Sequence, residues 1–146
     1  MINEIGVATW IGAIHKYSKS FIFEKLKDIN MGDGPYISIL TKLYEKDGVS
    51  QEELATSIRA DKATMTRALL KLEQEGYIQR YSDEKDRRAY KVYLTEKAMN
   101  IKSHIIDAHN EWNDIMTRGL TEEEREILFI LLRKTFFNLT KHSCNK

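Results

Sequence analysis

The fold is decided by residues 50–76, which read SQEELATSIRADKATMTRALLKLEQEG. Ser50 followed by Glu53 is a capping box, in which each side chain satisfies a free backbone N–H group at the start of a helix. Asp61 is the predicted N-cap of a second helix, and Gly76 suits the left-handed residue that ends it. The stretch therefore predicts two short helices joined by a tight turn, which is a helix-turn-helix.

The second of these helices is predicted over 62–75, with one buried and one open face. Its buried stripe, at helical spacing, consists of Met65, Ala68, Leu69 and Leu72. The opposite face presents Ala63, Thr66, Arg67, Leu70 and Gln74, flanked by Thr64 and Lys71. Arg67 can reach the O6 and N7 acceptors of a guanine, Ala63 or a threonine methyl can pack on a thymine methyl, and Lys71 suits a phosphate. For this helix alone, an ordinary solvated surface helix is the alternative.

Two short runs rich in aromatic and β-branched residues follow, at 77–81 and 89–94. The stretch between them is polar and includes Arg87, so the sequence predicts a β-hairpin. Asp86 stands two residues before Arg88, where it can brace the guanidinium group. An arginine held at a loop tip suits a narrow A·T minor groove. Two helices followed by a basic hairpin describe a winged helix-turn-helix; a solvated charged turn is the alternative.

The charge of the chain is distributed unevenly. The 146 residues carry a formal net charge of only +1, so the net charge does not indicate any class of binding partner. Residues 59–91, however, hold nine Lys or Arg against six Asp or Glu, an excess of +3, which leaves −2 for the rest. The positive excess falls in the segment that would touch DNA, as electrostatic binding to phosphates requires.

Long amphipathic helices are predicted on both sides of this segment. They span 5–29, 96–118 and 121–140. Gly119 breaks the chain between the last two, and Thr121 with Glu124 forms a second capping box that opens the last helix. The three helices carry more apolar surface than one small domain would bury, so we expect a second copy to cover it. The predicted fold class is mainly α with a small β-hairpin wing (α+β), in a single domain over 1–146. Within it, 34–94 forms the DNA-binding lobe, and 5–29 and 96–140 supply the dimerisation helices.

The remaining composition indicates an intracellular protein. Cys144 is the only cysteine, so no disulfide can form within the chain, which suits a reducing compartment. Residues 1–10 lack the basic start of a signal peptide, and no apolar run approaches the roughly 18 residues of a membrane span. We therefore expect a cytoplasmic protein without a membrane partner. We interpret Cys144 as an incidental thiol rather than a redox switch.

The motifs, taken in order, closely resemble those of the MarR family (multiple-antibiotic-resistance-type regulators). They are residues 48–55 (GVSQEELA), 61–67 (DKATMTR), 72–78 (LEQEGYI), 83–88 (DEKDRR) and 94–97 (LTEK). The resemblance covers nearly the whole chain. Two places depart from the common pattern: Ala98 stands where a glycine often follows, and 31–36 replaces the usual entry to the second helix.

The resemblance implies a homodimer joined by the first and last helices and a near-palindromic operator in double-stranded DNA. It also implies repression that is often relieved by a small phenolic or other anionic aromatic ligand. By position, the residues that would read or position the major groove are Lys62, Thr64, Thr66 and Arg67. Arg88, braced by Asp86, would enter the minor groove.

A ligand pocket is a further expectation. The side chains that could line it, between the dimer helices and the DNA-binding lobe, are Trp10, Ile14, Tyr17, Tyr36 and Trp112. Because aromatic residues at helical spacing are common in plain hydrophobic cores, packing alone is the alternative interpretation.

Three alternative functions compete with that of a ligand-released DNA-binding regulator. A winged helix can serve as a protein-docking module, which would bind no duplex even at low salt. A metal-responsive regulator of the same fold could use His104 with Asp107, and Glu24 in a dimer. His104 and His109, however, lie about 140° apart on a helix, so we predict no metal site. The sequence contains no phosphate-binding loop, nucleophile elbow or paired carboxylates that would indicate an enzyme. No cofactor is predicted.

Overall fold

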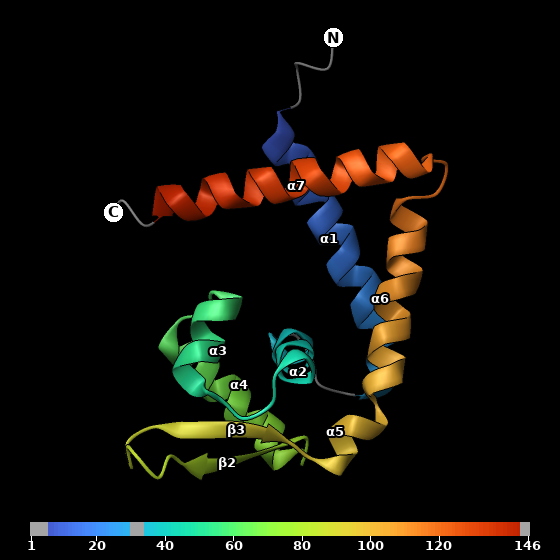
Figure 1. The fold of residues 1–146 in the computed structure, drawn as a ribbon. Helices are drawn as coiled ribbons and strands as arrows, with labels where there is room; N and C mark the ends of the chain where they lie inside the picture. Colours follow the sequence, from blue (N-terminus) through green and yellow to red (C-terminus); the bar gives the residue numbers. More distant parts are fainter. Residues whose placement is uncertain (1–5, 30–33, 144–146) are drawn as a thin grey trace. The chain divides into compact units, whose positions relative to one another are not determined.

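The computed structural model of the chain describes residues 6–29 and 34–143 (Figure 1). Its elements are α1 (Val7–Lys25), the 3-10 helix η1 (Lys27–Ile29), α2 (Tyr36–Glu45), β1 (Val49–Ser50), α3 (Gln51–Ile58), α4 (Lys62–Gln74), β2 (Ile78–Ser82), β3 (Tyr90–Leu94), α5 (Glu96–Asn100), α6 (Lys102–Met116) and α7 (Glu122–Ser143). Helices dominate and the strands form one small sheet, which confirms the predicted fold class. The residues up to Asn110 form one unit, and those from Glu111 onward form a second.

The sheet has three antiparallel strands in the order β1-β3-β2. The predicted hairpin is confirmed, with Ile78 of β2 opposite Leu94 of β3. The third strand, β1, was not predicted, and in it Val49 pairs with Val92. Asp47 fastens this edge, because its Oδ1 accepts a hydrogen bond from the backbone N–H of Leu94 at 2.9 Å. A two-residue strand is too short to show an alternating pattern, which is why the sequence does not reveal it.

The predicted helix caps are confirmed at both helices of the helix-turn-helix. The Ser50 hydroxyl accepts a hydrogen bond from the backbone N–H of Glu53 at 3.1 Å. The Asp61 carboxylate accepts one from the backbone N–H of Thr64 at 2.8 Å. Gly76 ends the second helix with a φ of +77°, a conformation that an L side chain would strain. Local sequence therefore sets the length of both helices.

Several predicted helix boundaries differ by a few residues from those observed. α1 ends at Lys25, and the 3-10 helix η1 continues the chain to Ile29. The last helix, predicted over 121–140, spans Glu122–Ser143, and Pro35 precedes α2 as its N-cap. Ile5, the predicted start of the first helix, lies outside the described residues.

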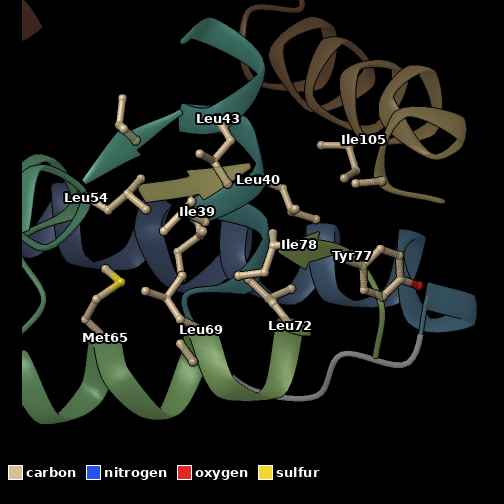
Figure 2. Packing of buried hydrophobic residues seen from close by; sticks show 14 of the residues in the cluster. Ile39, Leu40, Leu43, Leu54, Met65, Leu69, Leu72, Tyr77, Ile78 and Ile105 are labelled. Atoms are coloured by element: carbon tan, nitrogen blue, oxygen red, sulfur yellow. The ribbon is translucent and has the colours of Figure 1, made fainter. Parts of the chain in front are cut away.

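The hydrophobic core of the first unit is built around α2, α4 and the sheet (Figure 2). Its largest fully buried side chains are Ile39, Leu40, Leu43, Leu54, Met65, Leu69, Leu72, Ile78, Val92 and Ile105. The cluster also takes in Leu26, which follows α1, and Ala98, Ile105 and Ala108 from α5 and α6. The core that holds the lobe predicted over 34–94 therefore draws on residues from both flanks.

The prediction of one continuous helix over 96–118 is wrong, because the helix is interrupted at Ile101 and forms the separate helices α5 and α6. The Tyr44 hydroxyl donates a 2.6 Å hydrogen bond to the carbonyl oxygen of Ala98. In an unbroken helix that oxygen would accept from the backbone N–H of Lys102. Burial raises the pKa of Tyr44 to about 12, so the hydroxyl keeps its proton at neutral pH. Tyr44 is 54 residues away, which is why helical periodicity alone misses the break.

The second unit contains the end of α6 and the whole of α7. Gly119, with a φ of +86°, forms the predicted break before it. The second predicted capping box is confirmed in both directions: Thr121 Oγ1 accepts from the backbone N–H of Glu124 at 3.2 Å, and Glu124 Oε2 accepts from that of Thr121 at 2.8 Å. The large apolar side chains that α7 leaves exposed are Ile127, Leu128, Phe129, Ile130, Leu131, Leu132, Phe136, Phe137 and Leu139.

Candidate nucleic-acid interface

α4 exposes the face that the sequence predicts for DNA. Its four inward residues, Met65, Ala68, Leu69 and Leu72, are all buried. The residues Lys62, Ala63, Thr66, Arg67, Leu70 and Gln74 are exposed, while Thr64 and Lys71 are partly buried. The predicted division into a buried and an open face is confirmed. Contact of these residues with DNA stays a prediction.

A chain of hydrogen bonds holds Arg67 on this face. Thr64 donates its hydroxyl hydrogen to Asp61 Oδ2 at 2.7 Å, and its Oγ1 accepts from the Arg67 guanidinium at 3.3 Å. The backbone N–H of Thr64, followed by its hydroxyl, holds the pKa of Asp61 below its usual value. Asp61 therefore stays ionised at neutral pH. It caps α4 and, through Thr64, orients Arg67.

Asp61→Ala is expected to lower the thermal midpoint of unfolding and the preference for operator over random DNA, since it removes both the cap and the acceptor for Thr64. Asp61→Asn keeps a capping oxygen, so it should recover the midpoint more fully than the DNA preference. The lowered pKa means that the stabilisation is present above the ordinary aspartate pKa and is lost as pH falls through the lowered one.

Thermal melts from pH 3 to 7, with operator and random-duplex binding at pH 7, would test this prediction. The operator-to-random ratio is the relevant binding quantity, because removing a negative charge strengthens attraction to any duplex. Equal loss of stability in both variants would show that the capping oxygen is not what matters.

Gln51, the first residue of α3, is a neighbour of this face that the sequence analysis missed. Its Nε2 donates a hydrogen bond to Thr66 Oγ1 at 3.0 Å, and the Thr66 hydroxyl in turn donates to the Lys62 carbonyl oxygen at 2.8 Å. A tie between two helices across a turn leaves no periodic signal in the sequence. It fastens the start of α3 to the middle of the open face of α4.

Lys71 lies further along α4 and contacts an aromatic ring. Its Nζ is 5.9 Å from the centre of the Tyr36 ring, within the range of a cation–π interaction. Tyr36, which we predicted as a pocket residue, is thus partly buried beside α4. The contact places the Lys71 ammonium beside the Tyr36 ring.

The wing, which comprises β2, β3 and the loop between them, is held by its own acidic residues. Asp86 Oδ1 accepts a hydrogen bond from the backbone N–H of Arg88 at 3.0 Å. The predicted bracing of the Arg88 guanidinium by Asp86 is therefore corrected: the carboxylate fixes the backbone of the loop, because a side chain two residues earlier folds back most easily onto the main chain. Arg87 and Arg88 are both exposed.

An ion pair joins the wing to α4. Arg80 Nε on β2 donates to Glu73 Oε2 at 3.0 Å, and a terminal nitrogen of the same guanidinium binds the same oxygen. The hydrogen bond from Arg80 holds the pKa of Glu73 below its usual value. Both side chains are at least partly buried, so the pair is better shielded than a surface ion pair. The sequence analysis did not single out either residue.

The predicted ligand-pocket residues are not gathered at one described cavity. Trp10, Ile14 and Tyr17 are exposed on α1, and Trp112 belongs to the second unit. A small open hollow of about 170 Å³ is lined by other residues: Lys42, Glu45, Lys46, Val49, Glu53, Leu54 and Ser57. The unusual entry to α2 at 31–36 falls partly outside the described residues. The pocket stays a prediction.

Within residues 6–29 and 34–143, no three His, Cys, Asp or Glu side chains are grouped as ligands of one metal ion would be. Burial lowers the pKa of His109, which favours its neutral form. Cys144 lies outside the described residues. Among the helices of the described ranges, none combines the length and the apolar composition of a membrane span.

Comparison with known proteins identifies the family of this chain. Residues 35–90 match the sequence profile of the MarR family. The chain is 31% identical over 131 residues to the HTH-type transcriptional regulator YybA of Bacillus subtilis, covering 90% of this chain and 87% of the relative. The chain belongs to the MarR family. The MarR match runs from Pro35 to the first residue of β3 and so contains the helix-turn-helix and the wing loop.

Solved MarR structures share this fold. A MarR transcriptional regulator from Methanosarcina mazei has a TM-score of 0.85 at 33% identity, covering 92% of this chain and 96% of that one. A putative MarR family regulator from Listeria monocytogenes, solved in complex with a 26mer DNA, has a TM-score of 0.87 at 26% identity, with 94% and 91% covered. As a MarR protein, the chain is a DNA-binding transcription regulator and not an enzyme.

Proposed function

We propose that two copies of this chain bind a near-palindromic operator. Each copy places α4 in a major groove and its wing in the adjoining minor groove. The observation that carries this proposal is the open face of α4, where the exposed Arg67 is held by Thr64 and Asp61. A guanidinium oriented before binding loses less conformational freedom on contact with guanine.

The exposed apolar surface of the outer helices supports the dimer. Within α1, all of which is described, no side chain is buried. Its exposed large apolar side chains are Val7, Trp10, Ile11, Ile14, Tyr17 and Phe23. α7 likewise exposes a run of large apolar side chains between Ile127 and Leu139. A helix of this kind is normally covered by a partner, and a second copy offers the same surface in return.

We further propose that the bound dimer represses, because it would occlude polymerase at a promoter, and that a small aromatic or anionic ligand releases it. The aromatic rings of Trp10 and Tyr17, on the surface that we assign to the dimer, support an aromatic ligand bound beside that interface, since such rings offer faces for stacking. Such a ligand can lower operator occupancy only to the extent that it binds one separation of the two α4 helices more tightly than the other. A regulator of this kind meets its operator in the cytoplasm.

The first experiment is binding of the purified protein to the DNA upstream of its own coding region, across a salt series, with a random duplex as control. Tight binding with two protected half-sites about 10 base pairs apart is expected. Equally weak binding to both duplexes, with the same steep salt dependence, would mean purely electrostatic contacts. Absence of binding at low salt would favour a protein-docking module.

Arg67→Ala is expected to cost about 1–3 kcal/mol of operator affinity and to relax preference at one base pair in each half-site. Arg88→Ala should instead weaken binding mainly where the flanking sequence is A·T-rich. Both follow from groove contacts, and fluorescence anisotropy with operator variants measures them. Equal losses on operator and random DNA for both variants would contradict these roles.

A further inference from the structure

The hydroxyl group of Thr66 is occupied within the protein. Its hydrogen is donated to the Lys62 carbonyl oxygen at 2.8 Å, and its oxygen accepts from Gln51 Nε2 at 3.0 Å. A threonine hydroxyl has one hydrogen to donate, so none is left for a base. Thr66 is nevertheless exposed in the middle of the open face of α4. The side chain therefore offers a base no hydrogen-bond donor, and its γ-methyl is the apolar group left to pack against one.

These two hydrogen bonds also fix the orientation of that methyl. A threonine in a helix divides between two χ1 rotamers, because its hydroxyl can bond a carbonyl of the preceding turn in more than one way. The Gln51 amide selects the rotamer that brings the hydroxyl to it. Since hydroxyl and methyl share one Cβ, holding one of them aims the other.

Thr64, two residues earlier on α4, differs in the partners that its hydroxyl binds. That hydroxyl connects Asp61 to Arg67, so it supports a side chain that itself reaches outward. The Thr66 hydroxyl supports no outward-reaching cation; its partners are a backbone carbonyl and Gln51. The two threonines therefore differ in role, although the sequence analysis assigns both of them to the major groove.

We propose that Thr66 recognises a thymine of the operator through its methyl group, and that Gln51 is the positioning residue that aims this methyl. The proposal rests on the proposed insertion of α4 in the major groove. There, only thymine presents a 5-methyl group, and apolar contact with it distinguishes T·A from the other pairs. Lys62 contributes its backbone carbonyl oxygen as the fixed point of the arrangement.

The test replaces each operator thymine in turn by deoxyuridine, which removes only the 5-methyl group. With the wild-type protein, one thymine in a half-site should respond, with binding weakened about fourfold, the effect of leaving one methyl uncovered. Thr66→Val has the shape of threonine and keeps the methyl, so it should retain the fourfold ratio. Thr66→Ser keeps the hydroxyl but lacks the methyl, so its ratio should fall to about one.

Gln51→Ala should reduce the thymine-to-uracil ratio below about twofold, because Thr66 then divides between rotamers. Gln74→Ala is the matched control, since it removes the same type of side chain from the exposed end of α4 and should keep the full ratio. Thermal melts of each variant confirm that it is folded. The ratio is the diagnostic quantity, since a merely structural role of Gln51 would lower affinity for both duplexes equally.

The proposal is overturned if no thymine responds to deoxyuridine, or if Thr66→Ser keeps the ratio while Thr66→Val loses it. An unchanged ratio in Gln51→Ala would remove the positioning role and leave the methyl contact standing. Failure of the underlying function looks different: the wild-type protein would then not distinguish its operator from a random duplex at all.

Discussion

The double variant Ile130→Glu, Leu131→Glu is expected to dissociate the dimer and to weaken operator binding by about 100-fold or more. Both side chains are about half exposed in the single chain, 50% and 54%, on the apolar helix α7. Burying an unpaired carboxylate against an apolar partner costs several kcal/mol, and a symmetric interface incurs this cost twice. Operator affinity should fall when the two copies separate, because linked half-sites gain roughly 10²–10⁴ in affinity from effective concentration.

Sedimentation velocity measures the proportion of protein that is dimeric, and fluorescence anisotropy measures operator binding over the same protein concentrations. Lys134→Glu is the control: it makes α7 more acidic at a position that is already charged and so is seldom placed inside an interface. It should remain dimeric. If the double variant becomes monomeric and still binds the operator with wild-type affinity, one copy suffices for recognition and the proposed arrangement on DNA is wrong.

Leu69→Ala is expected to destabilise the protein by about 2–5 kcal/mol, the usual cost of removing a large side chain from a packed core. Leu69 is fully buried, with 0% of its surface exposed, and it packs in the cluster between α2, α4 and the sheet (Figure 2). Domains of this size are stable by only about 5–15 kcal/mol. The substitution should therefore remove a large part of the total.

The adjacent residue supplies the control for this prediction. Leu70 stands next to Leu69 on α4 but is 45% exposed, so Leu70→Ala should cost well under about 1 kcal/mol. Urea unfolding followed by circular dichroism compares the two variants directly. A large loss of stability in both variants would mean that Leu70 is covered in solution. A small loss in both would mean that the core around Leu69 relaxes to fill the space.

The features that could be predicted from the sequence are those set by neighbours along the chain. The caps at Ser50, Asp61 and Thr121 each join residues three apart. The buried stripe of α4 repeats with the helix period, and Gly76 ends the helix where a positive φ is needed. Fold class and the division of α4 into two faces followed from these signals alone.

The features that escaped prediction depend on residues that meet only in the folded chain. Tyr44 divides the long helix by binding a carbonyl 54 residues away. Gln51 reaches Thr66 across the turn between two helices, and β1 exists only because β3 lies beside it. Asp86 was correctly placed in the wing loop, but which atom it would bind depends on the path of that loop. Periodicity carries no information on such pairings.

The ion pair between Arg80 and Glu73 has a consequence for the kind of operator that suits this protein. Because it fastens β2 to α4, the wing and the helix should move as one rigid body. In the proposed complex, the distance along the duplex between the base pairs at α4 and the minor groove at the wing is then fixed within each copy. Operators are thus expected to tolerate changes at their centre, where two copies meet, more readily than an insertion inside either half.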